Sequence, residues 1–145
     1  MGTTSHRQDG NMVRITALDH IVLRVSDVER SLRWYTERLG LAPVRVEQWR
    51  AGECPFPSVR VSAETIIDLI EGDVDHDRRN LDHFCMVVSA DDLAAARSSD
   101  EFEIVRDPDF ELYGARGYAD GLYIVDPDGN EIELRSYPGD DAGLR

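Results

Sequence analysis

The tripeptide Leu-Asp-His occurs twice in this chain, each time at the start of a strand-like stretch. Residues 18–26 read LDHIVLRVS and residues 81–89 read LDHFCMVVS. The two units also end alike, because residues 67–69 read IDL and residues 132–134 read IEL. A chain of 145 residues is too short for two large independent domains, so we expect two copies of one structural unit to share a single core.

The first unit is predicted to fold as βαβββ. Residues 21–25 are mostly apolar and β-branched, which favours a buried strand, and a helix follows at once. Ser26 and Glu29 have the spacing of a capping box at the start of that helix, and Gly40 suits the left-handed residue after it. Apolar or aromatic residues recur along this helix at helical spacing: Val28, Leu32, Tyr35 and Leu39. Three strands are expected after it, over 44–49, 58–62 and 65–71.

The second unit repeats this order of elements. We expect a strand over 84–88, a helix over 91–98 behind Ser89, and three further strands over 102–106, 121–125 and 131–137. Residues 126–129, Asp-Pro-Asp-Gly, should form the turn between the last two strands. The predicted fold is therefore α+β, with one domain over 14–137 built of two modules. Its parts are a disordered leader over 1–13, module one over 14–72, a linker over 73–80, module two over 81–137 and a tail over 138–145.

Charge and composition exclude several classes of function. The formal net charge of −13 repels nucleic acid and anionic membranes. No apolar run approaches the ~18 residues needed to span a bilayer, and the first residues lack the apolar stretch of a secretory signal. Two cysteines cannot build a disulfide framework and fit a reducing cytoplasm, where we expect the protein to act.

The duplicated histidines and carboxylates are candidate metal ligands. Strand side chains alternate between faces, so Asp68 shares its face with Ile66 and Ile70. An ionised carboxylate there is costly unless it is paired, hydrogen-bonded, bound to a metal or exposed at the mouth of a cleft. Either histidine alone would be an ordinary core or cleft residue; the repetition of His20 and His83 at one offset makes both candidates. Two imidazoles with one or two carboxylates suit zinc, manganese, iron, nickel or cobalt.

Four segments together resemble the vicinal oxygen chelate superfamily, which includes glyoxalase I, bleomycin-resistance proteins, fosfomycin-resistance enzymes, methylmalonyl-CoA epimerase and extradiol dioxygenases. The resemblance spans about 15–137. It rests on the order and spacing of LDHIVLRVSDVERSLRWYTERLGL, TIIDLIEG, LDHFCMVV and GLYIVDPDGNEIEL. Each motif is weak alone, but in this order they are jointly specific. The resemblance implies paired βαβββ modules that form two curved sheets around one metal-centred cleft.

The same resemblance assigns roles to individual residues. His20, His83 and Glu133 correspond to ligands of a divalent metal ion, and Asp68 occupies the fourth ligand position. Relatives commonly have Glu or Gln there, so the shorter Asp68 is either a ligand, a hydrogen-bond acceptor behind the ligands or a general base. The region from Tyr113 resembles the substrate-contacting stretch of the fosfomycin-resistance-like branch. Arg116 and Tyr113 are thus predicted to contact substrate, with a mobile surface arginine as the alternative, and Glu47 is a further possible cleft residue.

Two functions remain open at this stage. One is a divalent-metal-dependent enzyme acting on a small oxygen-chelating substrate, with isomerase, epimerase, lyase, transferase, hydrolase and ring-cleaving dioxygenase chemistry undistinguished. The alternative is a metal-free, bleomycin-resistance-like protein that sequesters a drug or metabolite. The resemblance also implies a homodimer, in which the modules pair either within one chain or across two chains.

Overall fold

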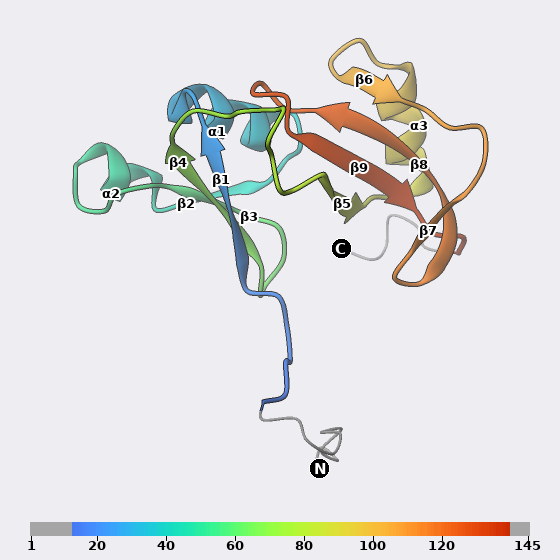
Figure 1. Cartoon of the computed structure of the whole chain (residues 1–145), viewed down its shortest axis with the longest axis horizontal. Helices are drawn as coiled ribbons and strands as arrows, with labels where there is room; N and C mark the ends of the chain where they lie inside the picture. Colours follow the sequence, from blue (N-terminus) through green and yellow to red (C-terminus); the bar gives the residue numbers. More distant parts are fainter. Residues whose placement is uncertain (1–12, 140–145) are drawn as a thin grey trace.

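The computed structural model describes residues 13–139, in which two β-sheets lie side by side (Figure 1). The first sheet has the strand order β1-β4-β3-β2, with β1 parallel to β4 and the other pairs antiparallel. Its module contains six elements: β1 (His20–Val25), α1 (Val28–Glu37), β2 (Ala42–Val44), α2 (Val46–Arg50), β3 (Ser58–Arg60) and β4 (Ile66–Glu71).

The second sheet repeats this design with the order β5-β9-β8-β6, and β5 is again parallel to β9. A short strand, β7, pairs only with the first residues of β8 and forms a hairpin that extends beyond the sheet. Its module also contains six elements: β5 (His83–Val87), α3 (Ala90–Ser98), β6 (Glu103–Arg106), β7 (Leu112–Gly114), β8 (Gly117–Val125) and β9 (Glu131–Ser136). The α+β fold with two related modules is confirmed.

Side-chain alternation decides which face of each sheet is buried. In β1, Leu23 and Val25 are buried in the core, whereas His20 and Val22 lie exposed on the opposite face. In the other central strands the outward residues are partly covered as well, since Asp68 and Glu133 are buried. The inward residues of these strands form one apolar cluster with helices α1 and α3: Ile67 and Leu69 in β4, Leu122 and Ile124 in β8, and Ile132 and Leu134 in β9. The faces that carry the duplicated histidines are therefore the ones turned away from the core.

Helix α1 joins the two modules through the turn between β8 and β9. The buried Tyr35 hydroxyl donates to Asp126 Oδ2 at 2.7 Å, and the Ser26 hydroxyl donates to Asp128 Oδ1 at 2.6 Å. Asp126 also accepts from the backbone N–H groups of Asp128 and Asn130, at 2.9 and 2.8 Å. Because Gly129 has φ +82°, the Asp-Pro-Asp-Gly turn expected from the sequence is confirmed.

Three local predictions are wrong. Residues 44–49 were expected to form a strand, but β2 ends at Val44 and the chain continues as helix α2, entered through Arg45 at φ 60°. The N-cap of α1 is Asp27, which accepts from the Arg30 N–H at 3.0 Å, because the Ser26 side chain is bound to Asp128 instead. Strand β8 begins at Gly117 rather than 121, since β7 pairs with it. The predicted leader over 1–13 and tail over 138–145 lie almost wholly outside the described residues.

Candidate functional site

The first histidine–carboxylate pair lies on the outward face of the first sheet. His20 begins β1 and Asp68 lies opposite Val22 in β4, so the parallel register brings the two side chains to one face. His20 Nε2 is 3.8 Å from Asp68 Oδ2, and His20 Nδ1 is 2.7 Å from Asp19 Oδ2. Asp68 is nearly buried, and its Oδ1 accepts from the Ser58 hydroxyl at 2.6 Å.

The second pair repeats this geometry on the outward face of the second sheet. His83 Nε2 is 3.6 Å from Glu133 Oε1, and His83 Nδ1 is 2.7 Å from Asp82 Oδ1. The Tyr123 ring packs edge-on against the imidazole, with 5.1 Å between ring centroids. Glu133 is buried, although its sequence context is typical of a half-exposed strand.

The aspartate before each histidine sets the orientation of the imidazole. A ring that donates its Nδ1 proton to a carboxylate keeps the Nε2 lone pair free, and metal-binding histidines are commonly supported in this way. The hydrogen bond that His20 donates to Asp19 raises the pKa of His20, and the hydrogen bond that Asp82 accepts from His83 lowers the pKa of Asp82. Our sequence reasoning missed Asp19 and Asp82, although both belong to the repeated Leu-Asp-His motif.

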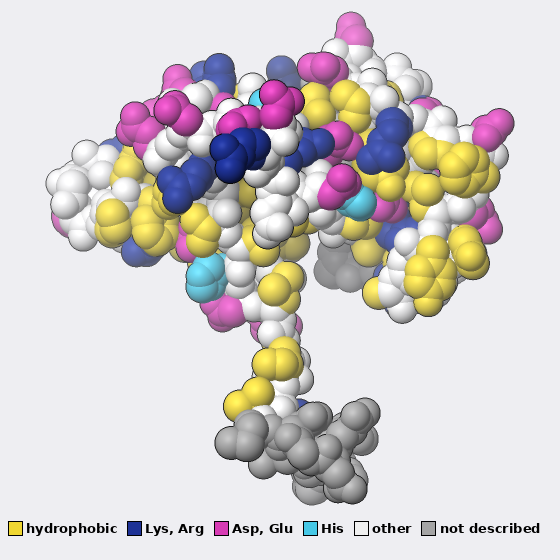
Figure 2. Space-filling view, in the orientation of Figure 1, with side chains coloured by type: hydrophobic (Ala, Val, Ile, Leu, Met, Phe, Trp, Pro, Cys, Tyr) yellow, Lys and Arg dark blue, Asp and Glu magenta, His cyan; other side chains and the backbone are white. Residues whose placement is uncertain are grey.

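The two pairs do not meet within one chain. They lie on different sheets, and residues 13–139 contain no group of three or more His, Cys, Asp or Glu side chains placed to hold one metal ion. Figure 2 shows the same separation, since the histidine side chains visible on this face do not gather in one patch. Each module therefore presents half of the predicted ligand set.

The second half-site contains a buried ion pair with unsatisfied polar atoms. Glu133 Oε2 lies 3.3 Å from Arg135 Nε, but the geometry is not that of a hydrogen bond, and neither atom has a hydrogen-bond partner among residues 13–139. Both side chains are about 95% buried or more. Buried charged atoms without hydrogen bonds are rare and commonly mark a functional site.

The side chains of two neighbours of Glu133 have raised pKa values. Desolvation by the surrounding side chains, and then the negative charge of Glu133, raise the pKa of the Cys85 thiol to about 12, although part of the residue reaches the solvent. The same two causes raise the pKa of Tyr123. Since the thiolate is the nucleophilic form, Cys85 is a poor nucleophile at neutral pH, and its chemistry in this site is that of a neutral thiol.

The predicted substrate-contacting residues lie on the hairpin formed by β7 and β8. The Arg116 N–H donates to the Tyr137 hydroxyl at 3.1 Å, and its guanidinium stacks over the Tyr137 ring at 4.2 Å. Tyr113 is 75% exposed and packs edge-on against Tyr118. Glu47 lies on α2 and pairs with Arg50 at 3.4 Å, beside α1 and not beside either histidine pair.

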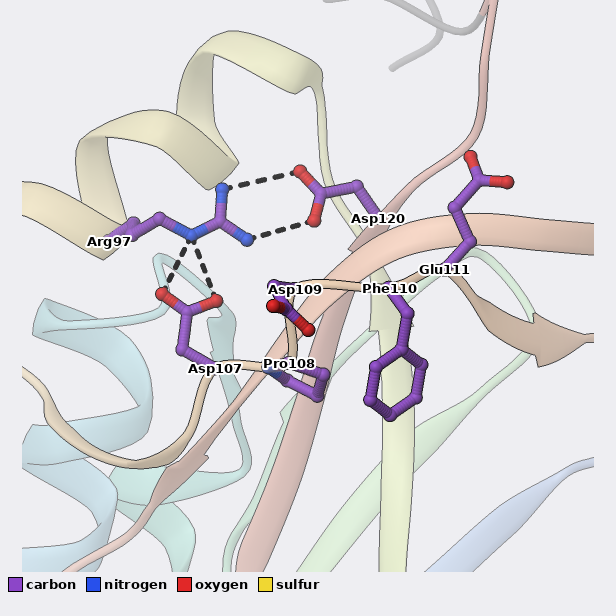
Figure 3. A pocket seen from close by; sticks show the side chains of 7 residues that line it. All are labelled: Arg97, Asp107, Pro108, Asp109, Phe110, Glu111 and Asp120. Atoms are coloured by element: carbon purple, nitrogen blue, oxygen red, sulfur yellow. Dashed lines mark hydrogen bonds and ion pairs between the residues drawn. The ribbon is translucent and has the colours of Figure 1, made fainter.

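An open surface pocket of about 490 Å³ lies away from both pairs. Figure 3 shows its lining, in which Arg97 forms ion pairs with Asp107 and Asp120 at 2.9 Å each. The other residues around it are Pro108, Asp109, Phe110 and Glu111. The pocket contains none of the predicted ligands. Among the described residues, no helix combines the length and apolar character needed to cross a membrane.

The sequence matches a known family over most of its length. A sequence model of the Glyoxalase/Bleomycin resistance protein/Dioxygenase superfamily matches residues 17–134. The chain belongs to this superfamily. Both histidine–carboxylate pairs fall within the matched residues, so the resemblance expected from the repeated motifs is confirmed.

Relatives of this superfamily member include proteins from bacteria and a fungus. Virulence protein STM3117 of Salmonella typhimurium is 30% identical over 134 residues, which cover 91% of each chain. Glyoxalase domain-containing protein RDO1 of Mycosarcoma maydis is 28% identical over 125 residues, 85% of this chain and 69% of that protein. Among solved structures, STM3117 superposes with a TM-score of 0.66 over 86% of this chain and 99% of that chain, at 28% identity. A glyoxalase/dioxygenase from Nostoc punctiforme, 21% identical, has a TM-score of 0.63 over 94% and 99%, which shows the shared fold.

Proposed function

We propose that the protein is a divalent-metal-dependent enzyme of the glyoxalase type, acting on a small substrate that chelates the metal through adjacent oxygens. The observation that carries the proposal is the duplicated half-site. In each module a histidine Nε2 lies within 4 Å of a nearly buried carboxylate, while a second carboxylate holds Nδ1. This arrangement prepares the nitrogen and oxygen atoms to bind a cation.

The donor set fits a divalent ion. Two imidazoles and two carboxylates suit zinc, manganese, iron, nickel or cobalt. The buried Glu133 carboxylate is further support, because its Oε1 faces His83 Nε2 and a buried carboxylate is stabilised by a bound cation. A bound metal ion would supply Lewis acidity to the substrate oxygens.

We propose that one complete centre combines the first half-site of one chain with the second half-site of another. Exposed apolar side chains flank both histidines along the chain: Leu18 and Val22 around His20, and Leu81 and Val87 around His83. Apolar side chains in such rows are characteristic of surfaces that a partner covers. A twofold dimer brings the two complementary faces together twice and forms two equivalent centres.

The positions of Asp68, Arg116 and Tyr113 suggest their roles in this proposal. Asp68 is held by the Ser58 hydroxyl and serves as the fourth ligand or as a base at the metal-bound substrate. Arg116 and Tyr113 lie on one hairpin and contact the substrate beyond the metal. The reaction class stays open among isomerisation, epimerisation, lyase chemistry, ring cleavage and the transferase or hydrolase reactions of fosfomycin-resistance-like enzymes.

The proposal is tested by measuring the metal content and mass of protein purified without chelators. We expect about one divalent ion per chain, a dimer by light scattering, and loss of the metal in His83→Ala and in His20→Ala. His76→Ala is the matched control, because His76 lies outside both half-sites and should leave the metal content unchanged. Substoichiometric metal that neither His83→Ala nor His20→Ala alters would contradict the proposal.

The alternative function is a metal-free protein that sequesters a drug or metabolite. The same purified protein can be used to distinguish it from the enzyme. Tight binding of a ligand that persists in EDTA, with no turnover, would favour sequestration over catalysis. We place the enzyme first because Glu133 is a buried charge and an aspartate holds each histidine, and apolar ligand binding requires neither feature.

A further inference from the structure

Arg135 lies two residues beyond Glu133 on β9, and strand alternation puts both side chains on one face. Only 3% of Arg135 is exposed, and its Nε lacks a hydrogen-bond partner. A buried guanidinium is stable only where its donors and charge are matched by neighbours. The contacts of Arg135 therefore indicate what it is held in place to do.

The guanidinium touches three parts of the second module. Its Nε faces Glu133 Oε2 at 3.3 Å, its Nη2 donates to the Leu112 carbonyl in β7, and its Cζ lies 5.0 Å from the centre of the Tyr137 ring. Tyr137 in turn holds the backbone and side chain of Arg116. One side chain thus connects the candidate metal ligand with the hairpin that carries the predicted substrate contacts.

The hairpin backbone is shaped to accept this side chain. A Cβ atom on Gly114 would overlap Arg135 Nη1 and lie 2.7 Å from the Tyr137 hydroxyl. A Cβ atom on Gly121, which pairs with Arg135 across β8 and β9, would lie 3.2 Å from Glu133 Oε2. Glycine at both positions leaves the space that the Glu133 and Arg135 side chains occupy.

We infer that Arg135 is a positioning residue: its ion pair with Glu133 Oε2 orients the carboxylate so that Oε1 faces the metal, and its bond to Leu112 couples the metal ligand to the β7–β8 hairpin. Oε1 is the atom that faces His83 Nε2, at 3.6 Å. A guanidinium can engage a carboxylate and a carbonyl from one rigid plane, whereas a lysine ammonium is a single point charge. The inference rests on the proposed metal centre, because it gives Arg135 a role only if Glu133 binds a metal.

The first test uses Co²⁺ as a probe, because its visible absorption reports ligand geometry. We expect Arg135→Met to weaken Co²⁺ binding about 10- to 100-fold, the usual effect of removing a residue that supports a ligand, and to alter the absorption bands. Arg135→Lys should restore affinity only in part. Arg97→Met is the control, since Arg97 forms ion pairs with Asp107 and Asp120 away from the half-sites.

The second test measures coupling by hydrogen exchange of peptides that cover 112–119. In the wild type, Co²⁺ should slow exchange in the hairpin, and in Arg135→Met this metal-dependent slowing should disappear. Gly114→Ala provides an independent variant, because it displaces the guanidinium without removing its charge. It should reproduce both effects and keeps the test available if Arg135→Met does not fold.

The outcomes separate the two proposals. If the wild type binds no Co²⁺, the proposed metal function fails and the role of Arg135 fails with it. If the wild type binds Co²⁺ but the absorption bands and the hairpin exchange are the same in Arg135→Met, Gly114→Ala and Arg97→Met, only the role of Arg135 is overturned. Altered bands together with lost coupling in Arg135→Met and Gly114→Ala support it.

Discussion

The two half-sites have the same histidine geometry and different carboxylate environments. In both, Nδ1 lies 2.7 Å from the preceding aspartate and Nε2 faces a carboxylate, at 3.8 Å in the first module and 3.6 Å in the second. Asp68, however, accepts a hydrogen bond from the neutral Ser58 hydroxyl, whereas Glu133 faces the buried cation of Arg135 and keeps an unsatisfied oxygen.

The two modules therefore support their histidines alike and their carboxylates differently. The duplicated Leu-Asp-His motif fixes how each imidazole points, so that part of the site is symmetric. The carboxylates are supported by residues outside the motif, so that part has diverged. The second half-site holds a buried ion pair and depends on its charges, while the first is satisfied by one hydrogen bond.

The largest expected effect is a difference in stability between Glu133→Gln and Asp68→Asn in metal-free protein. Glu133→Gln leaves the Arg135 cation buried without its counter-charge and should lower the free energy of unfolding by about 3 kcal/mol. Asp68→Asn retains an acceptor for Ser58 and should lower it by about 1 kcal/mol or less. Urea unfolding in EDTA measures both, and equal losses would contradict the division between the modules.

A smaller effect, on metal affinity, is expected for the feature that the two half-sites share. Asp19→Ala and Asp82→Ala each remove the carboxylate that holds Nδ1, and each should weaken metal binding about 10-fold. Titration of both variants with Zn²⁺ against a competing chelator measures the affinities. A large loss in one variant with none in the other would show that the histidine supports have diverged as well.

The smallest effect concerns the contact that joins the two modules. Tyr35→Phe removes the hydrogen bond to Asp126 and should lower the free energy of unfolding by about 1 kcal/mol at neutral pH. Burial and Asp126 raise the pKa of Tyr35 well above 10.0, so the folded state keeps this proton where the unfolded chain loses it. Stability should therefore fall as pH rises above about 10, and less steeply in Tyr35→Phe. Identical slopes in urea unfolding between pH 9 and about 11 would contradict this role for Tyr35.

Local sequence signals predicted most of the fold. The strand at the apolar, β-branched stretch 21–25, the Ser89 cap of α3 and the turn at 126–129 depend on neighbouring residues, and all three are confirmed. The wrong cap for α1 has a distant cause, since Ser26 is taken by Asp128 from the other module. Helix α2 replaced a predicted strand because β2 ends early and Arg45 turns the chain in a left-handed conformation.

The same distinction decides which features of the candidate site could be recognised in the sequence. The repeat identified both histidines and both carboxylates, because their spacing is local to each unit. The burial of Glu133 could not be foreseen, since it depends on the Arg135 side chain and on the hairpin that covers it. The separation of the two pairs within one chain follows from how the sheets pack, which no strand pattern encodes.

The central claim is that one metal centre combines His20 and Asp68 of one chain with His83 and Glu133 of another. Mixing His20→Ala with His83→Ala by co-refolding tests it directly, because a heterodimer then contains one centre with both substitutions and one that is intact. Each variant alone should bind no Zn²⁺. We predict that the equimolar mixture regains about a quarter of the wild-type Zn²⁺ content, since about half of the dimers are mixed. A mixture that stays as empty as its components would contradict an assembly across two chains.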